Sequence, residues 1–114
     1  MMRVVIIEDD EAIGFSLRLA LEDRGHDVTL YANPSSVPFD NLQADIILLD
    51  YYMPGMDGAA VLRKLRDNPD SAAIRIILMS ASTETRELAQ TLDVEYLAKP
   101  FDLSALFARL EVSR

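Results

Sequence analysis

The side chains of this 114-residue chain that could do chemistry come directly after short apolar runs. Glu8 and Asp9 follow the first run, Asp50 follows a later one, and Ser80 and Lys99 end two more. An aspartate can act as a nucleophile or a metal ligand. A lysine supplies a mobile positive charge that suits a phosphoryl oxygen, and a serine hydroxyl can donate to another oxygen. With Asp50 as the nucleophile, the set fits phosphoryl transfer to a carboxylate, which gives an acyl phosphate.

Each of these residues also has an ordinary explanation. The acidic run from Glu8 to Glu11 suits the start of a helix, where negative charge is favoured. Asp50 could form a turn, Ser80 could be a loop hydroxyl, and Lys99 could be a surface lysine. The functional interpretation therefore depends on a fold that brings these residues together.

The hydrophobic pattern predicts the elements that position them. Strands are expected over residues 4–7, 27–32, 45–49, 74–79 and 96–98, and helices over residues 11–24, 59–66, 82–91 and 103–110. Pro34 and Pro38 allow only a short or irregular helix between the second and third strands. Asp57 is the expected N-cap of the helix that follows it, and Gly25 is expected to end the first helix.

The apolar residues of two helices predict which faces are buried. In the first helix the core stripe consists of Ile13, Leu17, Ala20 and Leu21, and in the last it consists of Leu103, Leu106, Phe107 and Leu110. Phe15 and Leu19 lie four residues apart on a different face of the first helix, where we expect them to be exposed. His26 follows Gly25 in a loop and is expected to be solvated, without a role.

Strands that alternate with helices, without a hairpin signal, predict a doubly wound α/β fold. In this fold a parallel sheet carries helices on both faces, joined by right-handed crossovers. The carboxyl ends of parallel strands share one edge, where such sheets bind their ligands. Because the acidic pair, Asp50, Ser80 and Lys99 all follow strand ends, we expect them to meet at that edge. The length fits one domain over residues 1–114, with no effector domain in this chain.

The electrostatics of that edge predict a cation. Carboxylates about 5 Å apart repel by roughly 3 kcal/mol per pair at an effective dielectric near 20. A divalent ion would compensate this charge, and a set of oxygen ligands without cysteine or histidine favours Mg²⁺ or Mn²⁺.

Composition excludes several other classes of protein. The net charge is −8 and the pI is about 4.4, so the surface would repel nucleic acid. The absence of cysteine removes thiol chemistry and disulfides, and the apolar runs are too short to span a membrane. The first residues do not form a signal peptide, and we expect a cytoplasmic protein. A glycine-rich phosphate loop is missing after the first strand, which argues against a flavin or nucleotide binder.

Four stretches together resemble the receiver domain of two-component response regulators. They are VIIEDD (residues 5–10), LLDYYMPGMDG (48–58), MSA (79–81) and YLAKPF (96–101), and the resemblance extends over essentially the whole chain. It implies a five-stranded sheet of order 2-1-3-4-5 with a flavodoxin-like arrangement. It also implies a phosphorelay function, in which a histidine kinase or a histidine phosphotransfer protein is the partner.

The resemblance assigns roles residue by residue. Asp50 matches the phosphoacceptor, and Glu8 and Asp9 match the acidic pair. Mg²⁺ would be held by Asp50 and this pair, together with the backbone carbonyl of Tyr52. Lys99 matches the lysine that contacts the phosphoryl group, and the bond from it to the following proline is expected to be cis.

The resemblance further implies a switch rather than a turnover enzyme. Ser80 would turn toward the phosphoryl group, and the ring of Tyr96 would move inward into the space it leaves. An output face made by helix 82–91, strand 96–98 and helix 103–110 would then change. Phe15 and Leu19 would dock the kinase, and the chain would be a monomer or a phosphorylation-dependent dimer. The alternative is a receiver-like interaction module that works without phosphorylation.

The chain departs from the family pattern in its second crossover and between Ser80 and Lys99, where it is a little shorter than usual. The prolines of the second crossover stand where a regular helix is usual, and Asp93 to Glu95 stand where glycine and alanine are common. The second departure borders the expected output face.

Overall fold

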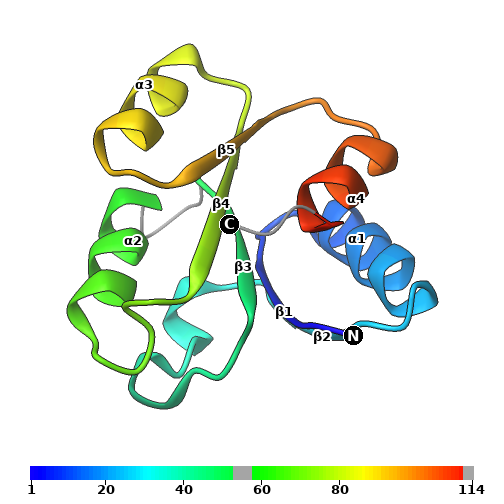
Figure 1. The fold of residues 1–114 in the computed structure, drawn as a ribbon, viewed down its shortest axis with the longest axis horizontal. Helices are drawn as coiled ribbons and strands as arrows, with labels where there is room; N and C mark the ends of the chain where they lie inside the picture. The colour runs from blue at the N-terminus through cyan, green and yellow to red at the C-terminus, as the bar shows by residue number, and fades with distance from the viewer. Residues whose placement is uncertain (53–57, 112–114) are drawn as a thin grey trace.

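The computed structural model describes residues 1–52 and 58–111 as a sheet between two layers of helices (Figure 1). The elements follow in the order β1 (Arg3–Ile7), α1 (Glu11–Asp23), β2 (Asp27–Tyr31), two 3-10 turns (Pro34–Ser36 and Phe39–Asn41), β3 (Ile46–Asp50), α2 (Gly58–Asp67), β4 (Arg75–Ser80), α3 (Thr83–Thr91), β5 (Glu95–Ala98) and α4 (Leu103–Glu111). The predicted doubly wound α/β fold is confirmed.

The five strands are parallel and lie in the order β2-β1-β3-β4-β5. This is the predicted order 2-1-3-4-5. The central strands β3 and β4 are buried along almost their whole length, because helices cover both of their faces. Such strands need no polar alternation, which explains the uninterrupted apolar runs in the sequence.

Each face of the sheet has its own hydrophobic core. On one face α1 and α4 lie together and pack Leu17, Leu21, Leu106 and Leu110 against the strands (Figure 1). On the other face, α2, α3 and the 3-10 turns contribute Val37, Leu42, Val61, Leu62, Leu65 and Ala89. No helix in the part of the chain that the structure describes has the length and apolarity needed to cross a membrane.

Local signals mark where the helices begin and end. The side chain of Asp10 accepts a hydrogen bond from the backbone N–H of Ile13 at 3.1 Å and caps α1. Gly25 follows α1 with a φ of +88°, a left-handed conformation that glycine adopts without strain. Ser82 caps α3, whereas the predicted cap Asp57 lies outside the described residues.

The core stripes of α1 and α4 differ from the prediction in one residue each. Ile13 is 39% exposed, and Gly14 takes the buried position next to Leu17 and Leu21. A Cβ on Gly14 would lie 2.9 Å from the side chain of Leu30, so the helix approaches β2 closely there. In α4, Leu103 is likewise 41% exposed.

The second crossover is irregular, as the prolines predict. Pro34 begins the first 3-10 turn, and the side chain of Asn33 caps it by accepting from the backbone N–H of Ser35. Val37 and Leu42 are nevertheless buried in the core beside α2. Two short turns therefore cover the sheet where a helix would otherwise do so.

Candidate functional site

Strand register brings the predicted site residues to one edge of the sheet. Ile7 pairs with Leu49, so Glu8 and Asp50 lie on adjacent strand ends. Ser80 pairs with Ala98 at the end of the next pair of strands, and Lys99 follows at once. The sequence analysis relied on this convergence, and the positions confirm it.

Lys99 bridges the two buried carboxylates. Its Nζ lies 3.0 Å from Oε2 of Glu8 and 3.3 Å from Oδ1 of Asp50. The backbone N–H of Asp10 donates to the other oxygen of Glu8 at 3.2 Å. Glu8 is therefore held in place by two donors, while Lys99 is shared between two acids.

Glu8, Asp9 and Asp50 form a group of carboxylates that could hold a metal ion. One oxygen from each lies within 4.8 Å of the others. All the donors are hard oxygen atoms, and one lysine does not neutralise three acids. The donor set and its excess negative charge therefore fit a divalent cation such as Mg²⁺.

Burial and charged neighbours change the pKa values of Asp50 and Lys99. The pKa of Asp50 is raised from 3.8 to about 7, first by burial and then by the hydrogen bond with Glu8 and repulsion from it, while Lys99 opposes the change. Burial acts to lower the pKa of Lys99, but its contacts with Glu8 and Asp50 outweigh this and raise it. Lys99 is therefore charged, but its charge does not fully compensate the burial of Asp50 and the repulsion from Glu8.

Ser80 is buried, and its hydroxyl makes two hydrogen bonds to residues that follow β4. It donates to Oγ1 of Thr85 at 3.1 Å and accepts from the backbone N–H of Ser82 at 3.0 Å. Thr85 lies in the first turns of α3 and is also buried. Sequence reasoning missed Thr85, because nothing in the sequence marks one threonine of a polar helix as a partner of Ser80.

Tyr96 is anchored to the loop between β4 and α3. Its hydroxyl lies 2.8 Å from the backbone oxygen of Ser80 and 3.1 Å from that of Ser82, and it donates to them. The backbone N–H of Lys99 donates to the same oxygen of Ser80 at 2.9 Å. Ser80 therefore links the predicted switch tyrosine and the site lysine through its backbone.

Three other predicted features can be placed. The peptide bond between Lys99 and Pro100 is cis, as the resemblance implies. Tyr52 is exposed, and its ring meets that of Tyr51 edge to face at 5.0 Å, while metal binding by its carbonyl stays a prediction. His26 is half-buried rather than solvated, and its Nδ1 accepts a hydrogen bond from the backbone N–H of Met2.

An apolar groove lies beside the site, between α1 and the start of α4. It has a volume of about 560 Å³ and is lined by Ala12, Ile13, Ser16, Leu17, Ala81, Lys99, Pro100, Phe101 and Leu103. Phe15 and Leu19 are 56% and 50% exposed, as predicted, but they do not line this groove. Two large apolar residues that line the groove with Lys99, Ile13 and Leu103, are exposed although the hydrophobic pattern placed them in the core.

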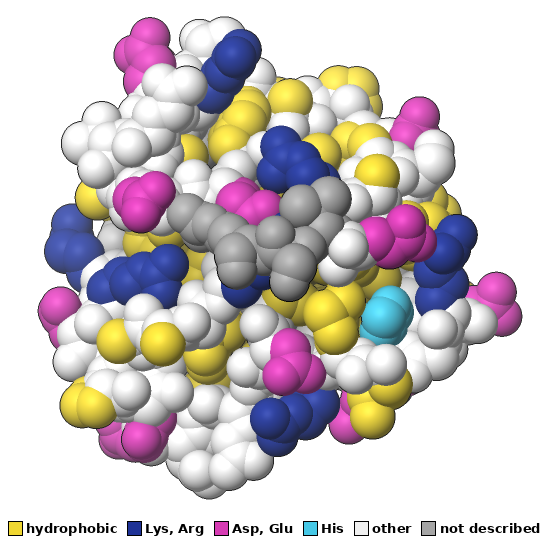
Figure 2. All heavy atoms as spheres, in the orientation of Figure 1, with side chains coloured by type: hydrophobic (Ala, Val, Ile, Leu, Met, Phe, Trp, Pro, Cys, Tyr) yellow, Lys and Arg dark blue, Asp and Glu magenta, His cyan; other side chains and the backbone are white. Residues whose placement is uncertain are grey.

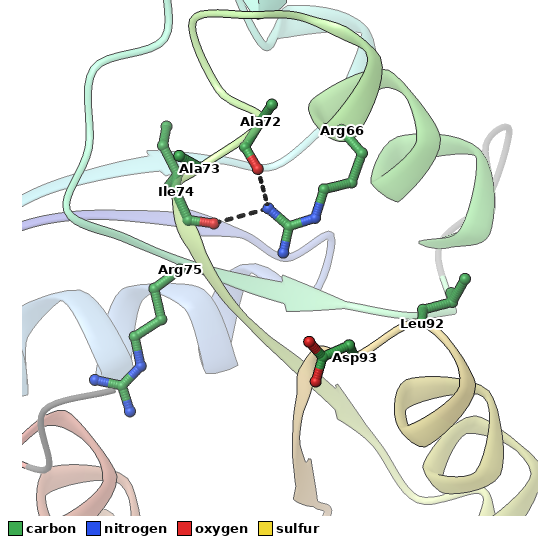
Figure 3. A pocket seen from close by; sticks show the side chains of 7 residues that line it. All are labelled: Arg66, Ala72, Ala73, Ile74, Arg75, Leu92 and Asp93. Carbon is green, nitrogen blue, oxygen red and sulfur yellow. Dashed lines mark hydrogen bonds between the residues drawn. The ribbon is translucent and has the colours of Figure 1, made fainter.

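A second cavity, of about 520 Å³, lies at the opposite edge of the sheet, where β4 begins (Figure 3). Arg66 donates from Nη1 to the backbone oxygens of Ala72 at 2.7 Å and Ile74 at 3.0 Å, while Arg75 points away from them (Figure 3). Arg66 therefore holds the loop before β4. Elsewhere, acidic and basic side chains are interspersed over the face in Figure 2.

Curated relatives match this chain over nearly all of its length. The phosphate regulon transcriptional regulatory protein PhoB of Rhizobium meliloti (strain 1021) is 30% identical, over 96% of this chain and 50% of the relative. The transcriptional regulatory protein KdpE of Staphylococcus aureus (strain NCTC 8325 / PS 47) is 36% identical, over 96% of this chain and 48% of that protein. The chain spans about half the length of these curated relatives.

Solved structures share the fold. A Francisella response regulator receiver domain is 28% identical with a TM-score of 0.85, over 96% of this chain and 93% of that one. The chemotaxis protein CheY4 of Vibrio cholerae, 22% identical with a TM-score of 0.87, covers 97% of both chains and supports the fold alone. A receiver domain of a sensor histidine kinase from Pseudomonas aeruginosa PAO1 is described with a magnesium ion coordinated in its active-site cleft. It is 25% identical with a TM-score of 0.83, over 96% of this chain and 94% of that one.

The model of the response regulator receiver domain matches residues 4–111. This range contains every strand end that contributes to the site, and the fold matches that of the Francisella receiver domain with a TM-score of 0.85. On these grounds the chain belongs to the response regulator receiver domain family.

Proposed function

We propose that this chain is a phosphorylatable receiver that accepts a phosphoryl group on Asp50 from the phosphohistidine of a histidine kinase or a histidine phosphotransfer protein. The observation that carries the proposal is the position of Asp50, at a strand end between a second buried acid and Lys99. Carboxylates and a lysine in this arrangement suit transfer of a charged group better than a structural turn.

In the proposed reaction an oxygen of Asp50 attacks the phosphorus atom of the phosphohistidine. The new P–O bond forms as the P–N bond breaks, and the imidazole leaves with the electron pair of that bond and takes a proton from solvent. Lys99 then exchanges its contact with Asp50 for one with a phosphoryl oxygen, because the ester oxygen of Asp50 has lost its charge. Hydrolysis of the acyl phosphate returns the free carboxylate.

The residues present fit a magnesium ion as the cofactor. Glu8, Asp9 and Asp50 would hold it, with the backbone carbonyl of Tyr52 as a further ligand. Bound there, Mg²⁺ or Mn²⁺ supplies the positive charge that offsets the acids and the incoming phosphoryl oxygens. The magnesium described in a structural neighbour from Pseudomonas aeruginosa supports this assignment.

The output is proposed to be a change at the face formed by α3, β5 and α4. Phosphorylation adds about −1.5 to −2 charges and strong acceptors at Asp50. Ser80 and Lys99 are the nearby donors, and both are connected to Tyr96 through the backbone oxygen of Ser80. A movement of Ser80 therefore changes the position of Tyr96 on the proposed output face.

The donor protein is proposed to dock on α1. The groove that contains Ile13 and Leu103 opens beside Lys99, and Phe15 and Leu19 extend the apolar surface of the helix. A helix of the donor that carries its histidine could cover these residues and reach Asp50. The net charge of −8 favours a protein partner over nucleic acid.

The proposal also describes a switch, not a turnover enzyme, because the chain itself is the group that is modified. We place it in the cytoplasm, where its cysteine-free composition suits a reducing compartment. It would act as a monomer or as a phosphorylation-dependent dimer through the output face.

The test is an intact-mass measurement after incubation with acetyl phosphate, with and without Mg²⁺. We expect one added phosphate on the wild type with Mg²⁺, and none without Mg²⁺ or in Asp50→Asn. Asp40→Asn is the matched control, because Asp40 lies in a 3-10 turn outside the carboxylate group and its variant should be phosphorylated like the wild type. A folded wild type that takes up no phosphate would overturn the proposal and favour the interaction module.

A further inference from the structure

We propose that Thr85 is a positioning residue that holds the hydroxyl of Ser80 away from Asp50 until a phosphoryl group is present. This inference rests on the proposed function, and it adds a residue that the resemblance and the sequence analysis leave without a role. Its basis is the hydrogen bond from Ser80 Oγ to Thr85 Oγ1, which is 3.1 Å long and buried.

The hydroxyl of Ser80 has one proton, and Thr85 is its acceptor in this structure. Its oxygen accepts in turn from the backbone N–H of Ser82 at 3.0 Å. Ser80 can therefore donate to a phosphoryl oxygen only after it gives up the bond to Thr85. Both side chains are about 1% exposed, so water does not readily replace the lost partner.

The position of Thr85 connects this exchange to α3. Ser80 lies at the end of β4, while Thr85 belongs to α3, and Ser82 caps the helix between them by accepting from the backbone N–H of Glu84. Rotation of the Ser80 side chain thus breaks its hydrogen bond to Thr85 in the first turn of α3. It does so beside Tyr96, whose hydroxyl donates to the backbone oxygens of Ser80 and Ser82.

A valine at residue 85 separates the hydroxyl of threonine from its shape. In Thr85→Val, the proton of Ser80 loses its acceptor in the resting state, and no threonine hydroxyl is left unpaired after Ser80 turns. Both effects favour the phosphorylated arrangement. We therefore expect Thr85→Val to bind a phosphoryl mimic about fivefold more tightly than the wild type, which is about 1 kcal/mol.

The experiment titrates beryllium fluoride into the protein with Mg²⁺ and follows tyrosine fluorescence, because two of the four tyrosines directly follow Asp50. Thr85→Ser keeps the acceptor and should bind like the wild type. Thr91→Val is the matched control, since it removes from the same helix an exposed hydroxyl that donates to the backbone carbonyl of Glu87. Urea unfolding of each variant verifies the fold, and Thr85→Ala is the second variant if valine is not accommodated.

A double-mutant cycle distinguishes positioning from a general effect on packing. In the Ser80→Ala background there is no hydroxyl for Thr85 to hold, so Thr85→Val should leave the affinity unchanged. The inference is overturned if folded Thr85→Val and Thr85→Ala bind like the wild type, or if the gain persists in the Ser80→Ala background. A wild type that binds no beryllium fluoride and takes up no phosphate would instead overturn the proposed function, and this inference with it.

Discussion

Asp50 is buried beside a second acid, and this placement makes the carboxyl group costly to ionise. Burial and the neighbouring Glu8 together raise its pKa from 3.8 to about 7, although Lys99 opposes the change. In the unfolded chain the carboxyl group of Asp50 loses its proton near pH 4, whereas in the folded chain it keeps this proton up to about pH 7. The contribution of Asp50 to stability is present at low pH and is lost as the pH rises through its folded pKa.

This gives a prediction for the metal-free protein. Between pH 5 and pH 8 in EDTA, the wild type should lose more of its free energy of unfolding than Asp50→Asn, by about 1–4 kcal/mol. The asparagine cannot ionise, and it keeps the shape of the side chain. Urea unfolding at the two pH values measures the difference. Equal pH dependence in the two proteins would show that ionisation of Asp50 does not destabilise the fold.

At the scale of elements, α3 ends in a way that the sequence did not indicate. Asp93 adopts a φ of 55°, and the backbone N–H groups of Asp93 and Val94 donate to the carbonyls of Gln90 and Ala89. A glycine usually occupies this left-handed position, although aspartate tolerates it better than most residues. The aspartate therefore ends the helix in the left-handed conformation that a glycine would usually adopt.

The start of α2 depends on a glycine that touches the backbone of the site. The N–H of Gly58 donates to the carbonyl of Tyr51 at 2.7 Å, and a Cβ on Gly58 would lie 2.7 Å from both the Cα and the carbonyl oxygen of Tyr51. Backbone atoms cannot rotate away as a side chain can. The loop after Asp50 would therefore have to shift.

We expect Gly58→Ala to lower the free energy of unfolding by about 1–3 kcal/mol and to slow phosphorylation by acetyl phosphate. Gly14→Ala is the matched control, because the three atoms nearest to its Cβ would all belong to the flexible side chain of Leu30 and not to backbone. It should be phosphorylated at the wild-type rate. Urea unfolding and intact mass over time provide both measurements, and wild-type behaviour of Gly58→Ala would refute the importance of this contact.

At the scale of the whole molecule, much of the fold and the site could be predicted because strand order and strand ends dominate both. Buried parallel strands leave long apolar runs, and the residue after each run is placed by the sheet. Which residues of α1 face the core was harder to predict. Ile13 is strongly hydrophobic but exposed, whereas Gly14 is much less hydrophobic but buried. The close approach of α1 to Leu30, which requires the glycine, has no periodic signal in the sequence.

The apolar surface of α1 is predicted to dock the protein that donates the phosphoryl group. Ile13→Ala and Phe15→Ala should each slow phosphoryl transfer from an autophosphorylated histidine kinase, chosen from a panel for its activity on the wild type. Transfer from acetyl phosphate should be unaffected, because a small donor needs no docking surface. Leu92→Ala is the control, since Leu92 is also exposed but lies at the end of α3. Equal slowing with both kinds of donor would exclude α1 as the docking surface.

The bridge from Lys99 to Glu8 joins residues that are 91 positions apart in the chain. During synthesis, the ribosome releases the acidic pair and Asp50 long before the lysine that compensates their charge. A nascent or truncated chain that stops short of β5 therefore carries the proposed phosphoacceptor Asp50 without its cationic partner. Under the proposed function, competence to accept a phosphoryl group would then arise only when the last strand is in place.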